Sequence, residues 1–347
     1  MKHISIMLAS LAGLLLLATA CNDEWKDEQY EHYLSFKAPL NDAGVSAVYV
    51  PYTRHTTNAN GESVPLYGVG ISNYQLPIIV SGTTNNDKDL NVKIVKSDTL
   101  SILNYERFQN RTDLYYQELP DQYVSYPSTH QVKAGENVSL FQLDFNFEGI
   151  DMSKKWVLPL EIVSTDQYQA HPRKHYAKAL LRVYPFNNYS GTYSATMQKM
   201  SRQGNADNAA GGEDTRAYVV DENTVFFYAG NDIDETRTDR ELYKVYAKFT
   251  PVTEDGKNGT VQFYDPTNNT ELGLQVDGVA TYSINDQPDE IQPYLLHRYI
   301  TISGIKYTFN DYTYIPGVYQ NYVVEGTLTM ERKLNTQIPD DDQAIEW

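Results

Sequence analysis

The 347-residue sequence predicts an all-β protein built from antiparallel sandwiches or barrels. Three observations carry this prediction. Apolar and polar residues alternate with period two along many short segments, long helical patterns do not occur, and clusters of Gly, Asn, Asp and Pro separate the segments. Such clusters are typical of hairpin turns, and the alternation places one face of each strand on a core and the other in water.

The alternation is clearest in five segments that we expect to be strands, namely Leu90–Val95, Phe141–Phe147, Tyr243–Phe249, Ile305–Phe309 and Val324–Met330. Turns are expected at Ser81–Asp87, Asp255–Gly259 and Asp265–Asn269. Apolar residues at mixed helical spacing predict a helical insert over Ser101–Gln117, which we expect to cross one end of the first pair of sheets. The glycine-rich stretch Gln203–Glu213 is expected to be an exposed, mobile loop.

A domain boundary is indicated in the middle of the chain. The apolar strand expected over Ala179–Tyr184 ends in the turn residues Pro185–Gly191, and a new strand is expected directly afterwards, over Gly191–Met197. The length that remains after a signal segment suits two ordinary domains, which we place at residues 35–185 and 186–347.

Residues 1–20 have the layout of a secretory signal peptide, with a basic start and an apolar stretch that contains no acid. The small residues Ala18–Ala20 before Cys21, the only cysteine, resemble a bacterial lipobox, although alanine stands at position 18 where leucine is usual. The resemblance implies cleavage before Cys21 and its acylation with chains such as palmitate, which anchors the protein to a membrane. The alternative is a plain signal peptide with an incidental cysteine, which would export a reactive thiol.

The segment over residues 21–34 is expected to be an acidic tether. Its charged residues resemble the export signal that directs Bacteroidetes lipoproteins across the outer membrane, and they are Asp23, Glu24, Lys26, Asp27 and Glu28. The resemblance implies a protein that is lipid-anchored in the outer membrane and faces the cell exterior. The alternative is a solvated charged tether, and both interpretations keep the chain outside the cytoplasm.

Composition excludes several classes of function. A net charge of -17 argues against nucleic acid, whose phosphates would be repelled. It argues equally against a strongly anionic polysaccharide, unless a local basic patch or a metal intervenes. If Cys21 carries lipid, no thiol remains for a disulfide, a metal site or nucleophilic catalysis.

Two groups of segments resemble domains of Bacteroidetes surface lipoproteins. The first group resembles an immunoglobulin-like N-terminal domain that is also found in front of some family 18 endoglycosidases, and it comprises Leu119–Tyr123, Val132–Asn137 and Trp156–Ile162. The second resembles the partner C-terminal domain, expected to be an antiparallel β-barrel or lipocalin-like fold, and it comprises Asn188–Tyr193, Tyr307–Asp311 and Arg332–Trp347. Together they leave no room for a hydrolase domain. The resemblance implies a two-domain lipoprotein of a polysaccharide-utilisation system.

Motifs for catalysis are missing from the sequence. It contains no HExxH pair, no zinc-type Cys/His set, no G-x-S-x-G turn, no P-loop and no dinucleotide fingerprint. We therefore expect no enzyme activity, no cofactor and no metal site, although the paired acids of a glycosidase cannot be recognised by spacing. Asp232, Asp234 and Glu235 either bind calcium through oxygen ligands or form a solvated acidic loop.

Glycan capture needs an aromatic face for a sugar ring and short polar side chains for its hydroxyls. Loop tyrosines are candidates because strand aromatics normally enter the core, and the sequence contains 29 tyrosines. The glycan-binding candidates are Tyr294, Asn310, Asp311, Tyr312, Tyr314, Tyr319 and Asn321. A second set, in the first domain, is Tyr115, Tyr116, Tyr123 and Tyr126. The alternative for each tyrosine is a half-buried packing residue.

These observations predict a non-catalytic cell-surface lipoprotein that captures oligosaccharides for an outer-membrane importer, with surface glycosidases as further partners. The alternative is a structural or adhesive lipoprotein of the fimbrial type, which would polymerise by strand exchange at sheet edges. The tripeptide Asp98-Thr99-Leu100 matches the short pattern on which exported Bacteroidetes proteins can be O-glycosylated.

Overall fold

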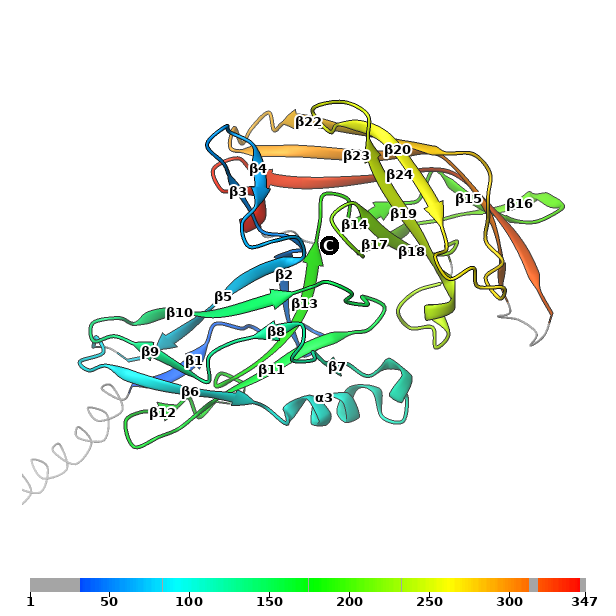
Figure 1. Cartoon of the computed structure of the whole chain (residues 1–347). Helices are drawn as coiled ribbons and strands as arrows, with labels where there is room; N and C mark the ends of the chain where they lie inside the picture. The colour runs from blue at the N-terminus through cyan, green and yellow to red at the C-terminus, as the bar shows by residue number, and fades with distance from the viewer. Residues whose placement is uncertain (1–31, 83, 174, 232, 312–317, 344–347) are drawn as a thin grey trace, which may run out of the picture.

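The computed structural model describes residues 32–82, 84–173, 175–231, 233–311 and 318–343. Within them the prediction of an all-β, two-domain fold is confirmed, because the chain forms a pair of packed sheets followed by a closed barrel. Figure 1 shows the barrel beside the sandwich, with the helix α3 (Thr99–Phe108) beneath the sandwich in this view. No helix in the described part of the chain is long and apolar enough to cross a membrane.

The first domain is a sandwich of two sheets. One sheet contains, in spatial order, β12 (Gln169–Ala170), β1 (Tyr33–Phe36), β5 (Ile71–Val80), β10 (Val138–Asn146) and β8 (Val124–Ser125). The other contains β2 (Ser46–Pro51), β13 (Lys178–Phe186), β11 (Trp156–Val163), β6 (Leu90–Lys96) and β9 (Thr129–Val132), with β7 (Gln117–Glu118) beside β11. Most neighbouring strands are antiparallel, but β1–β12, β2–β13 and β7–β11 are parallel.

The inward faces of these sheets form the core of the sandwich. Phe141, Leu143 and Phe145 alternate along β10 and are at most 1% exposed, while the residues between them are nearer the surface. Leu158 and Leu160 of the opposite sheet are fully buried in the same cluster. Each such side chain contributes roughly 1.5–3 kcal/mol on burial, so the alternation read from the sequence is the main source of stability here.

The helical insert lies elsewhere than the sequence predicted. Helix α3 and the 3-10 turn Thr112–Leu114 fall within the expected range Ser101–Gln117 to within two residues, but they do not cross one end of the sandwich. Leu100 instead packs with Val157 of β11 and Leu180 of β13. Because side chains alternate along a strand, these two point away from the sandwich core, and the helix covers the apolar outer face that they create.

The second domain is a closed antiparallel barrel. Its strands follow the order β14 (Gly191–Ser194), β17 (Asp214–Val219), β18 (Thr224–Tyr228), β19 (Lys244–Pro251), β20 (Asn258–Tyr264), β22 (Ala280–Pro288), β23 (Leu295–Asp311) and β24 (Gln320–Asn335). The ring closes because β24 pairs with both β23 and β14. Outside the ring, β15 (Gln198–Arg202) and β16 (Asn205–Gly211) extend one edge, and β21 (Gln275–Val276) pairs with β23.

Aromatic side chains fill the interior of the barrel. Tyr193, Phe249 and Phe309 are at most 2% exposed, and the ring of Tyr189 stacks on Phe249 with 3.9 Å between ring centres. The cavity enclosed among residues such as Tyr307 measures about 10 Å³, which is room for one water molecule at most. This interior is a packed core, so a bound ligand must be sought on the outside of the barrel.

The expectation of a mobile loop over Gln203–Glu213 is wrong. Most of this stretch is strand β16, which pairs antiparallel with β15 and begins right after a tight turn at Gln203–Gly204. Gly204 has a φ of +83°, a conformation that glycine adopts without steric cost. The glycine that suggested a loop therefore marks a hairpin turn.

Polar contacts and ion pairs join the two domains. Arg182 on β13 donates through Nη2 to both carboxylate oxygens of Glu235, at 3.0 and 2.9 Å. The Tyr218 hydroxyl on β17 donates to the same carboxylate at 2.9 Å. Lys244 on β19 lies 3.1 Å from a carboxylate oxygen of Asp151 in the first domain. The domains are thus held against each other by specific contacts as well as by the covalent linker.

Candidate functional site

A cavity of about 470 Å³ lies where the two domains meet, within the range of about 300–1,000 Å³ that is usual for ligand pockets. The first domain and the linker contribute Pro51, Tyr52, Thr53, His55, Thr56, Thr57, Ser63, Phe186, Asn187 and Asn188. The barrel and the C-terminal segment contribute Glu222, Asn223, Arg298, Arg332, Leu334, Pro339, Asp340 and Asp341. Most of these side chains are polar, so the cavity can offer many hydrogen bonds.

One wall of the cavity is an arm formed by β3 (His55–Thr57) and β4 (Ser63–Pro65), which pair with each other as a separate two-stranded sheet. Its turn is organised by Asn58, whose side-chain oxygen accepts hydrogen bonds from the backbone N–H of Asn60 and Glu62 at 2.9 and 3.0 Å. The strand side chains of the arm are mostly exposed. The arm therefore contributes little to the core and serves mainly to enclose the cavity. Figure 1 shows β3 and β4 projecting from the sandwich at the level of the barrel.

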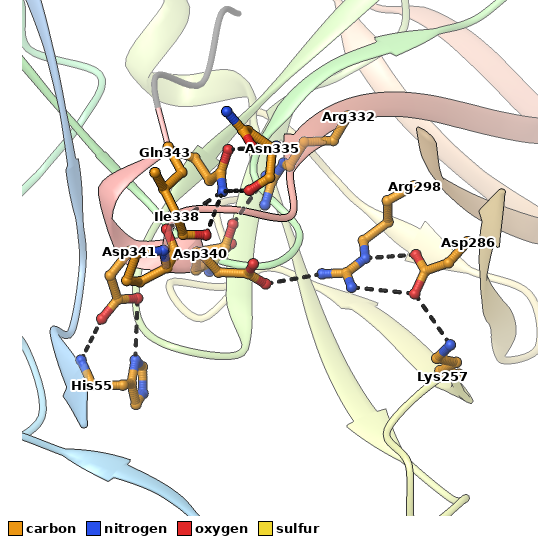
Figure 2. A network of polar contacts seen from close by, with 12 residues as sticks. His55, Lys257, Asp286, Arg298, Arg332, Asn335, Ile338, Asp340, Asp341 and Gln343 are labelled. Carbon is orange, nitrogen blue, oxygen red and sulfur yellow. Dashed lines mark hydrogen bonds and ion pairs between the residues drawn. The ribbon is translucent and has the colours of Figure 1, made fainter. Parts of the chain in front are cut away.

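The arm is joined to the C-terminal 3-10 turn η3 (Asp340–Asp342) across the mouth of the cavity. Arg54, just before the arm, donates through Nη1 to Asp342 at 2.8 Å. The backbone N–H of His55 donates to the carboxylate of Asp341, and the His55 ring lies 3.6 Å from that carboxylate and 3.4 Å from Glu222. Figure 2 shows this contact between His55 and Asp341 from close by. Residues far apart in the sequence thus form one polar rim.

The turn η3 is positioned by one buried side chain. Gln343 is 6% exposed, and its side-chain oxygen accepts a hydrogen bond from the backbone N–H of Asn335 at 2.9 Å. Its side-chain nitrogen donates to the carbonyl oxygens of Asn335 and Ile338, at 2.9 and 3.1 Å. These bonds fold the chain after β24 back over the barrel end, which is why the acids of η3 reach the cavity (Figure 2).

Arg298 on β23 forms part of the floor. It donates to both carboxylate oxygens of Asp286 on β22, at 2.7 and 3.2 Å, and to Asp340 at 3.3 Å. Lys257 also lies 3.1 Å from the Asp286 carboxylate. The hydrogen bond from Arg298 is the largest cause that lowers the pKa of Asp286, so this carboxyl stays ionised and fixes the guanidinium.

Arg332 on β24 is the deepest cation of the cavity, at 7% exposed. Its Nη2 donates to the carbonyl oxygens of Asn187 and Ser190, at 3.0 and 2.6 Å. The Asn187 side chain in turn accepts from the backbone N–H of Tyr189 and Ser190. Burial lowers the pKa of Arg332 to about 10. Arg332 therefore fixes the interdomain linker turn while its charge lies beside the cavity.

The described glycan-binding candidates do not come together in one site. Tyr294 is 42% exposed just before one end of β23, whereas Tyr319 is 54% exposed beyond its other end, so the 17 residues of that strand lie between them. Asp311 is 5% exposed and accepts hydrogen bonds from Arg237 at 2.6 and 3.2 Å. The side chain of Asn321 donates to Gln203 at 3.1 Å.

None of the described candidates lines the cavity between the domains. Asn310 lies beside Leu272, whose carbonyl accepts its backbone N–H at 2.8 Å. Tyr312 and Tyr314 lie outside the described residues, as do Cys21, the tether acids and Asp232. The cavity residues Arg332, Asp340 and Asp341 belong to the terminal segment whose family resemblance was noted, and this was the one signal that pointed to them. His55 and the arm carried no signal in the sequence.

The remaining predicted residues have structural roles. Tyr116 is 5% exposed and packs in one cluster with Leu100 of helix α3, and Tyr123 and Tyr126 pack against the sandwich core. Glu235 belongs to the domain interface, and Asp234 accepts hydrogen bonds from the backbone and hydroxyl of Thr236. Among the residues that the structure describes, no three His, Cys, Asp or Glu side chains are arranged to hold a metal ion.

A pH-dependent contact lies next to the cavity floor. The His297 ring lies 2.8 Å from Asp289 and also contacts Glu331, and the hydrogen bond to Asp289 is the largest cause that raises the pKa of His297 above 6.5. The same contact lowers the pKa of Asp289 to about 2. Stabilisation by the His297 charge is complete below pH 6.5 and is lost as pH rises through the raised value. Stabilisation by Asp289 is complete above pH 3.8 and is lost as pH falls toward 2.

We therefore expect an NMR titration of His297 in the wild-type protein to have its midpoint above 6.5. Asp289→Asn should move the midpoint down, because it removes the larger of the two contacts. Glu290→Gln changes the next acid along the chain, whereas the described ion pairs of the ring are with Asp289 and Glu331, so this matched control should leave the midpoint in place. A wild-type midpoint at or below 6.5 would contradict the contact.

The fold and the cavity define a class of two-domain, all-β proteins in which a sandwich and a barrel enclose a polar cavity at their junction. Two family models match successive parts of the chain: "Domain of unknown function (DUF4973)" matches residues 25–167, and a BT3044-like C-terminal domain matches residues 177–329. No curated protein matches the chain.

Several solved structures are similar over the whole fold. An auxiliary nutrient binding protein from Bacteroides thetaiotaomicron is 44% identical, with a TM-score of 0.77 and coverage of 92% of this chain and 100% of that chain. A multidomain protein including DUF1735 from Bacteroides ovatus is 40% identical, with a TM-score of 0.76 and coverage of 91% and 100%. A protein of unknown function from Bacteroides ovatus is 35% identical, with a TM-score of 0.76 and coverage of 92% and 97%. The chain belongs to the family of Bacteroides proteins that these structures represent.

Proposed function

We propose that the protein is a non-catalytic, lipid-anchored protein of the outer membrane that captures oligosaccharides at the cell surface. It would pass them to an outer-membrane importer and work beside surface glycosidases. One observation carries the proposal: a polar cavity of about 470 Å³ lies between the domains of a chain that is 44% identical to an auxiliary nutrient binding protein. The membrane attachment rests on Cys21 and the acidic residues that follow it.

The composition of the cavity favours a sugar over an apolar ligand. Each sugar hydroxyl both donates and accepts a hydrogen bond, and the lining offers short side chains of both kinds, such as Thr57, Ser63, Asn188 and Asn223. The aromatic side chains of the lining, Tyr52 and Phe186, are at most 6% exposed, so they cannot form a broad stacking surface. Recognition would therefore depend on hydrogen bonds.

The acids in the lining argue for binding rather than hydrolysis. Asp340 accepts a hydrogen bond from Arg298, and Asp341 and Glu222 lie beside His55. A glycosidase needs one carboxyl that stays protonated as the acid and a second as nucleophile or base. Each of these three acids instead already contacts Arg298 or His55.

The direct test is affinity electrophoresis and calorimetry of the mature chain against a panel of host and plant glycans. We expect at least one glycan to retard the protein and none to be hydrolysed. Ser63→Trp should weaken binding by at least about tenfold, because the indole would occupy the cavity beside the arm. Asn60→Trp, which adds the same group at the exposed turn of the arm, is the matched control and should bind normally.

Two further variants separate this site from the residues predicted from the sequence. Tyr294→Ala and Tyr319→Ala remove exposed rings outside the cavity and should leave the affinity unchanged. Loss of binding in either one, with Ser63→Trp unaffected, would place the site on the barrel loops instead. Failure of every glycan in the panel would contradict the proposed function itself.

Membrane attachment needs its own experiment. Metabolic labelling with a radioactive fatty acid should mark the wild-type protein and not Cys21→Ala. External protease should degrade the wild-type protein on intact cells. Replacing the tether acids Asp23, Glu24, Asp27 and Glu28 should protect the protein from protease, because it would stay inside the outer membrane. A wild-type protein without label would overturn the lipid anchor.

A further inference from the structure

The cavity between the domains contains one cation, Arg332, that forms no ion pair with a described carboxylate. Each acid in its lining has a partner: Asp340 accepts from Arg298 at 3.3 Å, and the carboxylates of Asp341 and Glu222 lie 3.6 and 3.4 Å from the His55 ring. The cation Arg298 is paired as well, because Asp286 accepts two of its hydrogen bonds. Only Arg332 remains among the charged residues of the lining.

Arg332 is buried, with 7% of its surface exposed, yet it forms no ion pair within the described part of the chain. Its Nη2 donates to two backbone carbonyls, and its buried Nε has no hydrogen-bond partner among the described residues. Buried guanidinium groups in proteins normally lie against a carboxylate, because an unpaired charge away from water is costly. Burial without such a partner also explains why the pKa of Arg332 is lowered to about 10.

We propose that the oligosaccharide captured in this cavity carries an anionic group, a carboxylate or a sulfate ester, that pairs with Arg332. This inference rests on the proposed function and narrows its ligand to acidic glycans. A guanidinium presents several donors in one plane, which matches the oxygens of either group. The ligand would then supply the counter-charge that the protein itself does not provide.

The acidity of the whole chain does not oppose such a ligand strongly. Although the net charge is -17, charges at physiological salt are screened over about 8 Å, so distant surface acids act weakly inside the cavity. The three acids in the lining contact Arg298 and His55. This is the local basic group that the overall composition requires before an anionic glycan can bind.

Calorimetry on the unmodified mature chain provides the test. The first pair of probes is a galacturonate trisaccharide and its carboxyl-reduced counterpart. The second pair is a sulfated galactose trisaccharide and its desulfated counterpart. We expect one acidic probe to bind at least about tenfold tighter than its neutral partner, which is the usual scale of a hydrogen-bonded charge pair. The pair of probes that shows the preference identifies the anionic group as a carboxylate or a sulfate ester.

Two variants test whether Arg332 causes the preference for the acidic probe over the neutral one. Arg332→Gln should reduce the preference to about twofold or less, whereas Lys333→Gln removes an exposed cation from the neighbouring position and should leave it intact. Because Arg332 also fixes the linker turn, thermal unfolding of Arg332→Gln must be measured. If that variant does not fold, blocking of the acidic probe by Ser63→Trp and not by Asn60→Trp places the pairing in the cavity.

The possible outcomes distinguish failure of the acidic-glycan inference from failure of the proposed glycan capture. Equal affinity for acidic and neutral probes overturns the inference and leaves glycan capture standing. A preference that survives Arg332→Gln assigns the anion to another cation and also overturns it. Binding of none of these probes overturns it too, and the broad glycan panel then decides whether the protein captures neutral sugars or no sugars.

Discussion

Replacing Glu235 with alanine is expected to destabilise the protein by about 3 kcal/mol, the low end of the cost of breaking a buried ion pair. Glu235 accepts two hydrogen bonds from Arg182 and one from Tyr218, and its loss leaves the guanidinium uncompensated at the domain interface. We choose the low end because 23% of the Glu235 side chain is exposed. Urea unfolding of the full chain, followed by tryptophan fluorescence, measures the change.

A matched control comes from the same interface. Glu241 contacts Lys154 of the first domain, but its side chain is 42% exposed, so Glu241→Ala should cost less than about 1 kcal/mol. An equal loss in the two variants would contradict the role that we assign to the buried pair. The comparison also reports on the domains, because loss of Glu235 should separate their unfolding transitions.

The effect of Glu235 should depend on pH. Burial alone would raise the pKa of this carboxyl, but Arg182, Arg216 and Tyr218 together lower it below 4.5. Its stabilisation is therefore complete above pH 4.5 and is lost as pH falls through the lowered value. The difference between wild type and Glu235→Ala should shrink in acid, whereas a pH-independent difference would point to lost packing instead.

Removing the arm is expected to abolish ligand binding while preserving the fold. The backbone N–H of Leu66 donates to the carbonyl of Arg54 at 2.7 Å, so the chain already closes there and residues 55–65 can be replaced by an Asn-Gly turn. The arm supplies His55, Thr56, Thr57 and Ser63 to the cavity. We expect affinity to fall by more than about tenfold, because a ligand would lose one wall of its site.

Stability should change little in this deletion, because the strand side chains of the arm are mostly exposed. Calorimetry with the glycan identified from the panel measures affinity, and thermal unfolding measures stability. The matched control keeps the arm and replaces Asn60 at its turn. Full affinity in the protein without the arm would show that the cavity between the domains is not the binding site.

Prediction from the sequence worked best for strands. The segments expected over Leu90–Val95 and Tyr243–Phe249 became β6 and β19 with ends shifted by two residues at most. The prediction of secondary structure failed where glycine can mark either a loop or a tight hairpin turn. Gly204 suggested a loop and instead makes a hairpin turn. Tyr307, by contrast, was expected on the same strand face as Ile305 and Phe309, and it lies with them in the barrel core, where burial raises its pKa to about 12.

The alternation of apolar and polar residues was enough to establish an all-β chain, because strand periodicity is a local property that needs only neighbouring residues. The tertiary structure alone decided the site. His55 and Asp341 are 286 positions apart, and they meet because the barrel closes and Gln343 folds the C-terminal segment back over its end. Contacts between such distant residues depend on how whole sheets pack, and no local pattern in the sequence records that packing.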